Sequence, residues 1–383
     1  MLPYSNPTPD ALLVGRVWVP SVGPVLVRVD GEEVVDITSR DLPTMQALLE
    51  FDDLVKVARS APGKPLCSLV QLTENSLRED HQQHIHLLAP ADLQAIKASG
   101  VTFAESMVER VIEEQAAGDA DRAEAIRVRV KSVIGDSLSG IEPGSDQAMQ
   151  VKAVLQQEGL WSQYLEVGIG PDAEVFTKCQ PMAAVGFGAD VGIHPISTWN
   201  NPEPEIVLAM NSRGDIVGAT LGNDVNLRDV EGRSALLLGK AKDNNASCAI
   251  GPFVRLFEGE FTLDSIRKAD LSMRVEGADG FVLDGFSSMT KISRDPAAIV
   301  KQTIGRHHQY PDGFFLFLGT MFAPVKDRDA EGQGFTHHGE DIVKITEANL
   351  GELRNRVRYS TECPEWTFGT SALIRNLAKR GLL

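Results

Sequence analysis

Two glutamates stand two residues apart at the start of an apolar run, with Glu203 and Glu205 leading into residues 206–210. Side chains at positions i and i+2 of a strand project from the same face, so both carboxylates point the same way. Asp224 follows after a turn-forming segment at residues 211–215. Three converging carboxylates repel one another unless a cation neutralises them. Oxygen ligands favour a hard divalent ion, so Glu203, Glu205 and Asp224 are the predicted ligands of Mg²⁺ or Mn²⁺.

Four further side chains are candidates for handling a substrate beside that metal. A leucine run ends in a glycine and presents Lys240 where the chain turns, with Lys242 as the competing lysine. A lysine at this place can hold a substrate carboxylate or transfer a proton, which makes Lys240 the predicted catalytic lysine. Thr320 follows a glycine at the end of an apolar run, where a hydroxyl and backbone amides can bind an anion. Lys178 and Arg228 are expected to add local positive charge.

The elements that must position these residues are mostly strands. Apolar runs bounded by Gly, Pro, Asn and Asp predict strands at residues 175–177, 205–210, 216–221, 253–257, 272–275, 281–283, 314–318 and 342–345. Apolar spacings of three and four predict helices over residues 101–125 and 145–159. Regular alternation of strands and helices is absent, which argues against Rossmann and TIM-barrel folds and favours an α+β fold.

The first 95 residues have a different pattern. Short strands are predicted at residues 11–19, 25–29 and 33–37, followed by a helix over residues 44–58. We therefore predict an N-terminal α/β accessory domain at residues 1–95 and a catalytic domain at residues 96–383.

Composition excludes several classes of function. The formal net charge of −16 argues against nucleic acid, which needs a basic surface, and against anionic membranes. No apolar stretch approaches the roughly 20 residues that span a bilayer. The first residues lack the basic and apolar regions of a secretion signal, so a cytoplasmic location is expected. The four dispersed cysteines form no CxxC pair, which predicts reduced thiols and not a zinc site.

Taken in order, these motifs resemble the fumarylacetoacetate hydrolase superfamily over residues 101–357. The shared pattern consists of Glu203 and Glu205, Asn223-Asp224 through Arg228-Asp229, Gly239-Lys240, Gly251-Pro252, Gly319-Thr320, and the tail segments at residues 339–343 and 350–355. The resemblance implies a mixed β-roll catalytic domain, commonly dimeric, with Mg²⁺ on the three carboxylates. A homodimer or higher homo-oligomer is therefore expected.

The chain departs from that family at one place. Hydrolytic members carry a Y-x-x-H-x-x-E segment whose His–Glu pair activates water, and the corresponding stretch here runs from Phe103 to Glu109. Glu109 matches the glutamate, but Ser106 stands in the place of the histidine. Serine cannot act as a general base near neutral pH, so the water-activating pair is incomplete.

The segment at residues 242–252 is most similar to the sugar-acid dehydratases of the superfamily. This resemblance implies a Mg²⁺-dependent lyase that dehydrates a small anionic 2-keto acid, a 2-keto-3-deoxy-pentonate of the D-arabinonate or D-xylonate type, to 2,5-dioxopentanoate. Glu109 is then the candidate acid for the departing hydroxyl, and Ser106 and Thr320 hold substrate oxygens. Two alternatives stay open: a metal-dependent hydrolase that cleaves a C–C bond of a diketo acid or acylpyruvate, and a non-enzymatic binding module. The stereoisomer of the substrate and the choice between Mg²⁺ and Mn²⁺ are also open.

Overall fold

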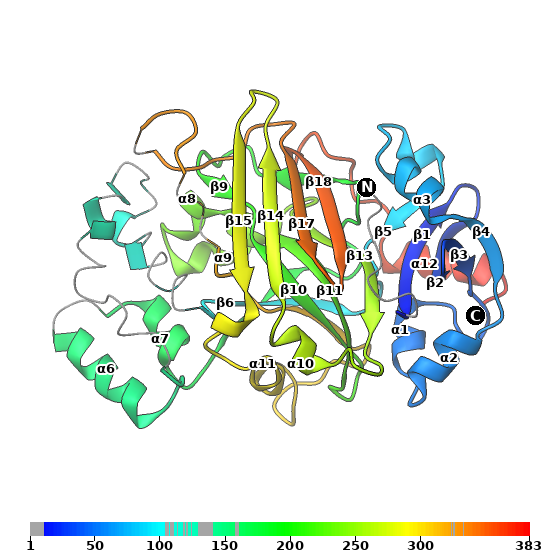
Figure 1. Ribbon diagram of the computed structural model, residues 1–383, viewed down its shortest axis with the longest axis horizontal. Coiled ribbons are helices and arrows are strands. Elements are labelled where there is room, and N and C mark those ends of the chain that lie inside the picture. Colours follow the sequence, from blue (N-terminus) through cyan, green and yellow to red (C-terminus); the bar gives the residue numbers. More distant parts are fainter. Residues whose placement is uncertain are drawn as a thin grey trace.

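Two β-sheets form the body of the protein (Figure 1). The computed structural model describes residues 11–103, 107, 111–112, 114–117, 119, 122–123, 125–128, 141–157, 161–322, 324, 326–331 and 333–383. The larger sheet has 11 strands in the order β4-β3-β2-β1-β13-β11-β10-β16-β6-β7, with β5 paired to β1. Its strands are β1 Leu13–Val19, β2 Gly23–Asp30, β3 Glu33–Asp36, β4 Lys64–Ser68, β5 His86–Leu88, β6 Ala95–Gly100, β7 Glu174–Cys179, β10 Pro204–Met210, β11 Ile216–Asp224, β13 Cys248–Leu256 and β16 Phe314–Phe317.

The second sheet lies across the front of the molecule in Figure 1, in the order β15-β14-β17-β18-β8. Its strands are β8 Asp190–Ile193, β14 Asp270–Glu276, β15 Val282–Ser288, β17 Ile342–Glu347 and β18 Gly351–Tyr359. A short ladder pairs β9 Asn200–Asn201 with β12 Asn226–Leu227. The sheets contain both parallel and antiparallel pairs, so the prediction of an α+β fold with mixed sheets is confirmed.

Helices are short and lie around the sheets. The helices with fully described bounds are α1 Met45–Leu49, α2 Leu54–Ser60, α3 Leu69–Ser76, α6 Asp146–Gln157, α7 Gln163–Ile169, α8 Arg228–Glu231, α9 Leu238–Lys242, α10 Leu263–Ile266, α11 Pro296–Thr303 and α12 Thr370–Lys379, with 3-10 turns at His81–Gln83, Ala235–Leu237 and Met289–Lys291. The helix predicted over residues 44–58 is divided into α1 and α2. The helix predicted over residues 145–159 corresponds to α6. Within the described part of the chain, no helix has both the length and the apolar character needed to cross a membrane.

Strand β10, which carries Glu205, is buried on both faces. Ile206, Leu208 and Met210 belong to the core between the two sheets, together with residues of β14, β17 and β18. Val207 and Ala209 face a second core, which α1 and α2 help to enclose. A strand buried on both faces needs apolar residues at every position, which accounts for the unbroken run after Glu205.

The N-terminal strands extend the larger sheet, because β1 pairs with β13 through Leu13 and Val14. The C-terminal helix α12 lies on the same part of the molecule, at the right of Figure 1. Asn376 donates to the carbonyl oxygen of Val22 at 2.7 Å, and Arg380 donates to that of Pro24 at 2.7 Å. The C-terminal helix α12 thus packs on the hairpin of β1 and β2. The domain division at residue 95 stays a prediction.

The structure describes only part of the helix predicted over residues 101–125, mainly residues of its apolar side. Met107, Val111 and Ile112 are fully buried in a third core with residues of α6 and α7. The predicted functional residues of this segment, Ser106 and Glu109, lie outside the described residues. Their roles therefore remain predictions.

One buried histidine gives a prediction about pH and stability. His86 in β5 is 8% exposed, and its burial lowers its pKa to about 4, although the hydrogen bond to the His84 carbonyl acts in the opposite direction. Unfolded histidine titrates near 6.5, so between pH 6.5 and 4 the unfolded state binds a proton that the folded state does not. The free energy of unfolding therefore falls as pH falls through this window.

In the variant His86→Gln, we expect the slope of the free energy of unfolding against pH to decrease in this window. The decrease should correspond to the uptake of up to about one proton on unfolding. Urea unfolding at several pH values between 7 and 4 measures the slope. His308→Gln, which changes an exposed histidine, should keep the wild-type slope. Equal slopes for wild type and His86→Gln would contradict the assignment.

Candidate active site

Three carboxylates meet where β10 begins and β11 ends. The two strands are antiparallel, with Pro204 opposite Asn223 and Glu205 opposite Gly222. This register brings Asp224 back to Glu203 and Glu205, and one oxygen from each carboxylate lies within 4.8 Å of the others. The three residues are 1–4% exposed. The predicted convergence of Glu203, Glu205 and Asp224 is therefore present.

Backbone hydrogen bonds hold these carboxylates in place. The Asp224 amide donates to the Glu203 carbonyl at 3.1 Å, and the Gly319 amide donates to Glu205 Oε2 at 2.6 Å. Gly319 has φ of +86°, and a Cβ there would lie 2.1 Å from Thr102 Oγ1, so only glycine fits. The glycine before Thr320 thus orients a carboxylate, which the sequence did not indicate.

The lysine at the carboxylates is Lys242. Its Nζ lies 2.5 Å from Glu203 Oε2 and 3.1 Å from Asp224 Oδ2, and its side chain is 3% exposed. Lys240 is exposed, and its Nζ lies 3.5 Å from His194 Nε2. The prediction that placed Lys240 at the carboxylates is therefore wrong. The helix α9 turns Lys240 outward and Lys242 inward.

Lys178 also lies against the carboxylates, but from behind. Its fully buried Nζ is 2.9 Å from Asp224 Oδ1 and also donates to the carbonyl oxygens of Val225 and Lys242. Three protein acceptors surround this ammonium, and Lys178 does not line the pocket described below. The structure therefore does not support the predicted contact of Lys178 with substrate and shows instead an anchor for Asp224.

Glu205 and Asp224 differ in the direction in which their surroundings shift the carboxyl pKa. Burial raises the pKa of Glu205 well above its usual value, and the neighbouring Asp224 and Glu203 raise it further. Burial also disfavours ionised Asp224, but the charges and hydrogen bonds of Lys178 and Lys242 outweigh this effect and lower its pKa. Without a cation, Asp224 is thus ionised and Glu205 favours its protonated form.

The cluster lines a narrow pocket that is open to solvent. Thr320 and Arg228 line it, and their predicted contacts with substrate stay predictions. Arg228 NH1 donates to the Pro324 carbonyl at 3.2 Å, and its guanidinium lies 4.4 Å from the centre of the Trp199 ring. Thr320 Oγ1 accepts a hydrogen bond from the Phe322 amide at 3.1 Å.

Comparison with known proteins adds to this geometry. No model of a protein family matches the chain. A Haloferax volcanii protein named a probable 2-keto-3-deoxyxylonate dehydratase is 28% identical over 324 residues, which is 84% of this chain and 93% of that protein. A 2-dehydro-3-deoxy-D-arabinonate dehydratase of Saccharolobus solfataricus is 30% identical over 188 residues, 48% of this chain and 58% of that protein. This second match thus spans less than two thirds of the relative.

Solved structures share the fold. A 2-keto-3-deoxy-D-arabinonate dehydratase complexed with magnesium and 2,5-dioxopentanoate matches with a TM-score of 0.62 at 22% identity, covering 91% of this chain and 99% of that one. A fumarylacetoacetate hydrolase of Exiguobacterium antarcticum matches with a TM-score of 0.54 at 14% identity, covering 91% and 100%. The chain has the fold of these enzymes. The predicted resemblance to the fumarylacetoacetate hydrolase superfamily is thus confirmed at the level of the fold.

Within this fold, the carboxylate cluster fits a small divalent cation. Its donors are all oxygens, and all three carboxylates are buried. Opposite ligands of Mg²⁺ lie about 4.2 Å apart, given metal–oxygen distances of 2.0–2.1 Å, so small side-chain movements would bring the three oxygens onto one ion. The repulsion that raises the Glu205 pKa is the repulsion that a cation would remove.

The pocket also contains residues that the sequence analysis did not single out. Asn201, Glu231, Phe176 and Phe322 line it. Glu231 lies three residues after Arg228 in α8, a spacing that places both on one helix face, and this signal was available in the sequence. Phe176 lies in β7, with its ring centre 5.7 Å from Lys242 Nζ. Its role depends on a contact between distant segments, which no local pattern predicts.

Proposed function

We propose that this protein is a Mg²⁺-dependent dehydratase that converts a 2-keto-3-deoxy-pentonate of the D-arabinonate or D-xylonate type to 2,5-dioxopentanoate and water. The observation that carries the proposal is the buried triad of Glu203, Glu205 and Asp224 with Lys242 beside it. Matched proteins are named dehydratases of such acids, and a neighbour is described with magnesium and 2,5-dioxopentanoate. These names favour dehydration over the alternative of C–C bond hydrolysis.

Glu203, Glu205 and Asp224 would hold the ion. When bound, Mg²⁺ supplies a positive charge that polarises the 2-keto group and stabilises the negative charge that develops on its oxygen. Lys178, fixed on the far side of Asp224, keeps that carboxylate ionised and aimed at the pocket. Mn²⁺ accepts the same ligands and is the alternative ion.

The remaining residues handle the substrate. A proton leaves C3, the hydroxyl on C4 departs as water, and a shift of the new double bond toward C5 yields the aldehyde of the product. Lys242 binds the substrate carboxylate or moves a proton, since its ammonium is the cation beside the triad. Arg228 and Thr320, which line the pocket, bind substrate oxygens. Ser106 is assigned to the same role and Glu109 to protonating the departing hydroxyl, both from the sequence.

A coupled assay tests the function. The purified protein is incubated with 2-keto-3-deoxy-D-arabinonate and Mg²⁺, with and without a chelator, and a semialdehyde dehydrogenase converts the product while NADH is followed. We expect NADH formation that the chelator abolishes and that Mg²⁺, and to a different degree Mn²⁺, restores. The D-arabinonate and D-xylonate forms of this substrate are one compound, because C4 is its one remaining stereocentre. Absence of NADH with this compound and with its L-isomer would overturn the proposal. The diketo-acid hydrolase would then be assayed by the loss of enol absorbance.

The assignment of Glu109 gives a separate prediction. Glu109→Gln removes the acid and is expected to lower turnover by about 10²–10⁴-fold, the usual contribution of general acid catalysis. Binding of Mg²⁺, measured by titration calorimetry, should stay at the wild-type value because Glu109 is not a proposed ligand. Glu105→Gln in the same segment is the matched control and should retain turnover. Near-normal turnover of Glu109→Gln would remove this residue from the mechanism.

A further inference from the structure

One wall of the pocket is formed by the long connection between β16 and β17. After Gly319, this connection contributes Thr320, Phe322 and Pro324 to the pocket lining. The Pro324 carbonyl also accepts the hydrogen bond from Arg228. The segment then leaves the pocket and rejoins the second sheet at Ile342. The position of this wall therefore depends on what fixes the connection outside the pocket.

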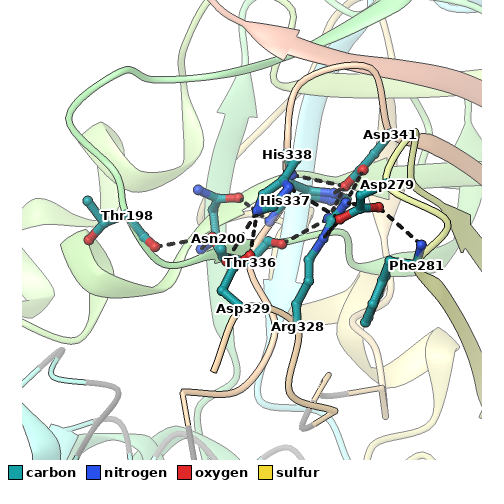
Figure 2. A network of polar contacts seen from close by, with 10 residues as sticks. All are labelled: Thr198, Asn200, Asp279, Phe281, Arg328, Asp329, Thr336, His337, His338 and Asp341. Atoms are coloured by element: carbon teal, nitrogen blue, oxygen red, sulfur yellow. Dashed lines mark hydrogen bonds and ion pairs between the residues drawn. The ribbon is translucent and has the colours of Figure 1, made fainter. Parts of the chain in front are cut away.

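Arg328 fixes it through two carboxylates (Figure 2). NH1 and NH2 donate to the two oxygens of Asp341 at 2.7 and 2.8 Å, and Nε and NH2 each donate to Asp279 at 3.1 Å. NH1 also donates to the Thr336 carbonyl at 3.2 Å, and the guanidinium lies 4.8 Å from the centre of the Phe281 ring. The Arg328 side chain is 1% exposed and that of Asp341 is 0% exposed. The planar guanidinium matches two carboxylates at once, which a lysine cannot do.

The same cluster reaches the opposite wall. Asp341 accepts hydrogen bonds from the His338 amide at 3.0 Å and from His337 Nδ1 at 2.9 Å, as Figure 2 shows. The His337 amide donates to Asn200 Oδ1 at 3.1 Å. Asn200 lies in β9, opposite Leu227, and Leu227 directly precedes Arg228. One buried ion pair thus connects the wall that carries Pro324 with the strand that leads into Arg228.

From this arrangement we infer that Arg328 is a positioning residue of the reaction, which sets the distance between the pocket wall at Phe322 and Pro324 and the substrate-binding side chain of Arg228. The inference rests on the proposed function, because it assigns to the cluster an effect on binding of the keto acid. Arg328 does not line the pocket, and within the described part of the chain its side chain contacts Asp279, Asp341, Thr336 and Phe281 and not the three carboxylates. Its effect should therefore appear in substrate binding and not in metal binding.

Arg328→Lys tests the inference because it keeps the positive charge and loses the planar guanidinium that pairs with two carboxylates at once. We expect the KM for the keto acid to rise at least tenfold, while kcat and the Kd for Mg²⁺ alone, measured by calorimetry, change less than twofold. Hydrogen exchange should become faster at the amides of Arg328, Gly334, His337 and His338, which are hydrogen-bonded within the segment that Arg328 anchors. Asp279→Asn is a second variant, to be used if Arg328→Lys does not fold. It leaves the Arg328–Asp341 pair in place and should raise the KM for the keto acid about threefold.

Arg274→Lys is the matched control, since Arg274 pairs with Glu276 and Asp284 on the second sheet and is 44% exposed. It should leave KM and exchange unchanged. An unchanged KM for Arg328→Lys, or a Kd for Mg²⁺ that rises in step with KM, would overturn the inference. If wild type shows no turnover of pentonates, the proposed function fails by itself. The variant is then judged by the Kd of 2-oxopentanoate, a 2-keto acid of the same chain length, in the presence of Mg²⁺, with the same tenfold criterion.

Discussion

Lys242→Met is expected to lower turnover by at least about 10²–10³-fold, whereas Lys240→Met should leave it within about twofold of wild type. Lys242 places its ammonium 2.5 Å from Glu203 and 3.1 Å from Asp224 inside the pocket, so this ammonium lies beside a keto acid bound at the three carboxylates. Lys240 is exposed and its Nζ lies beside His194. The measurement is kcat at saturating Mg²⁺ for both variants. Loss of turnover in Lys240→Met with retention in Lys242→Met would contradict the assignment.

The same pair of variants predicts an effect on stability. Removing one partner of a buried ion pair typically costs about 3–5 kcal/mol, because the other charge is left buried without compensation. Metal-free Lys242→Met should therefore unfold at a lower temperature than metal-free wild type. Mg²⁺ restores positive charge at the carboxylates, so it should raise the Tm of Lys242→Met more than that of wild type. Lys240→Met should follow wild type with and without the ion.

The difference between these two lysines shows how far the sequence could lead. The carboxylates were predictable because Glu203 and Glu205 follow the period of a strand, and because the short turn after β10 fixes the register that returns Asp224. The lysine was not predictable in this way. Lys240 and Lys242 are two residues apart in a helix, about 200° around its axis, so only one can face the cluster. Which one does so depends on how α9 packs, and the sequence contains no local signal for that.

The fold shows the same limit. Strands with clear alternation, such as β14 with its exposed Ser272 and Arg274 and buried Met273 and Val275, could be placed from sequence. The pairing of β1 with β13 joins residues about 240 positions apart, and no turn between them encodes it. The anchor of Arg328 by Asp279 likewise joins two segments, 49 positions apart in the chain. The sequence thus predicted which positions of a strand are buried or exposed, but it did not predict which strands and segments contact one another.

The second large effect is expected at Asp224. Asp224→Asn removes a metal ligand, so the Kd for Mg²⁺ should rise at least about 10²-fold and turnover should be lost at micromolar Mg²⁺. It also removes the partner of two buried ammonium groups, since Lys178 contacts Oδ1 and Lys242 contacts Oδ2. Because those ammoniums hold Asp224 ionised, metal-free Asp224→Asn should be less stable than metal-free wild type. Calorimetric titration and thermal unfolding measure the two effects.

Glu205→Gln separates the two effects, because Glu205 differs from Asp224 in its charge before the metal binds. Burial and the two neighbouring carboxylates raise its pKa, so in the metal-free protein this carboxyl favours its neutral form. A glutamine resembles that form and can still accept the hydrogen bond from the Gly319 amide. Metal-free Glu205→Gln should therefore be as stable as wild type or more stable, yet bind Mg²⁺ weakly, whereas Asp224→Asn loses both properties. Equal destabilisation by the two substitutions would mean that Glu205 is ionised before the metal arrives, and that the cluster carries one more negative charge than its contacts imply.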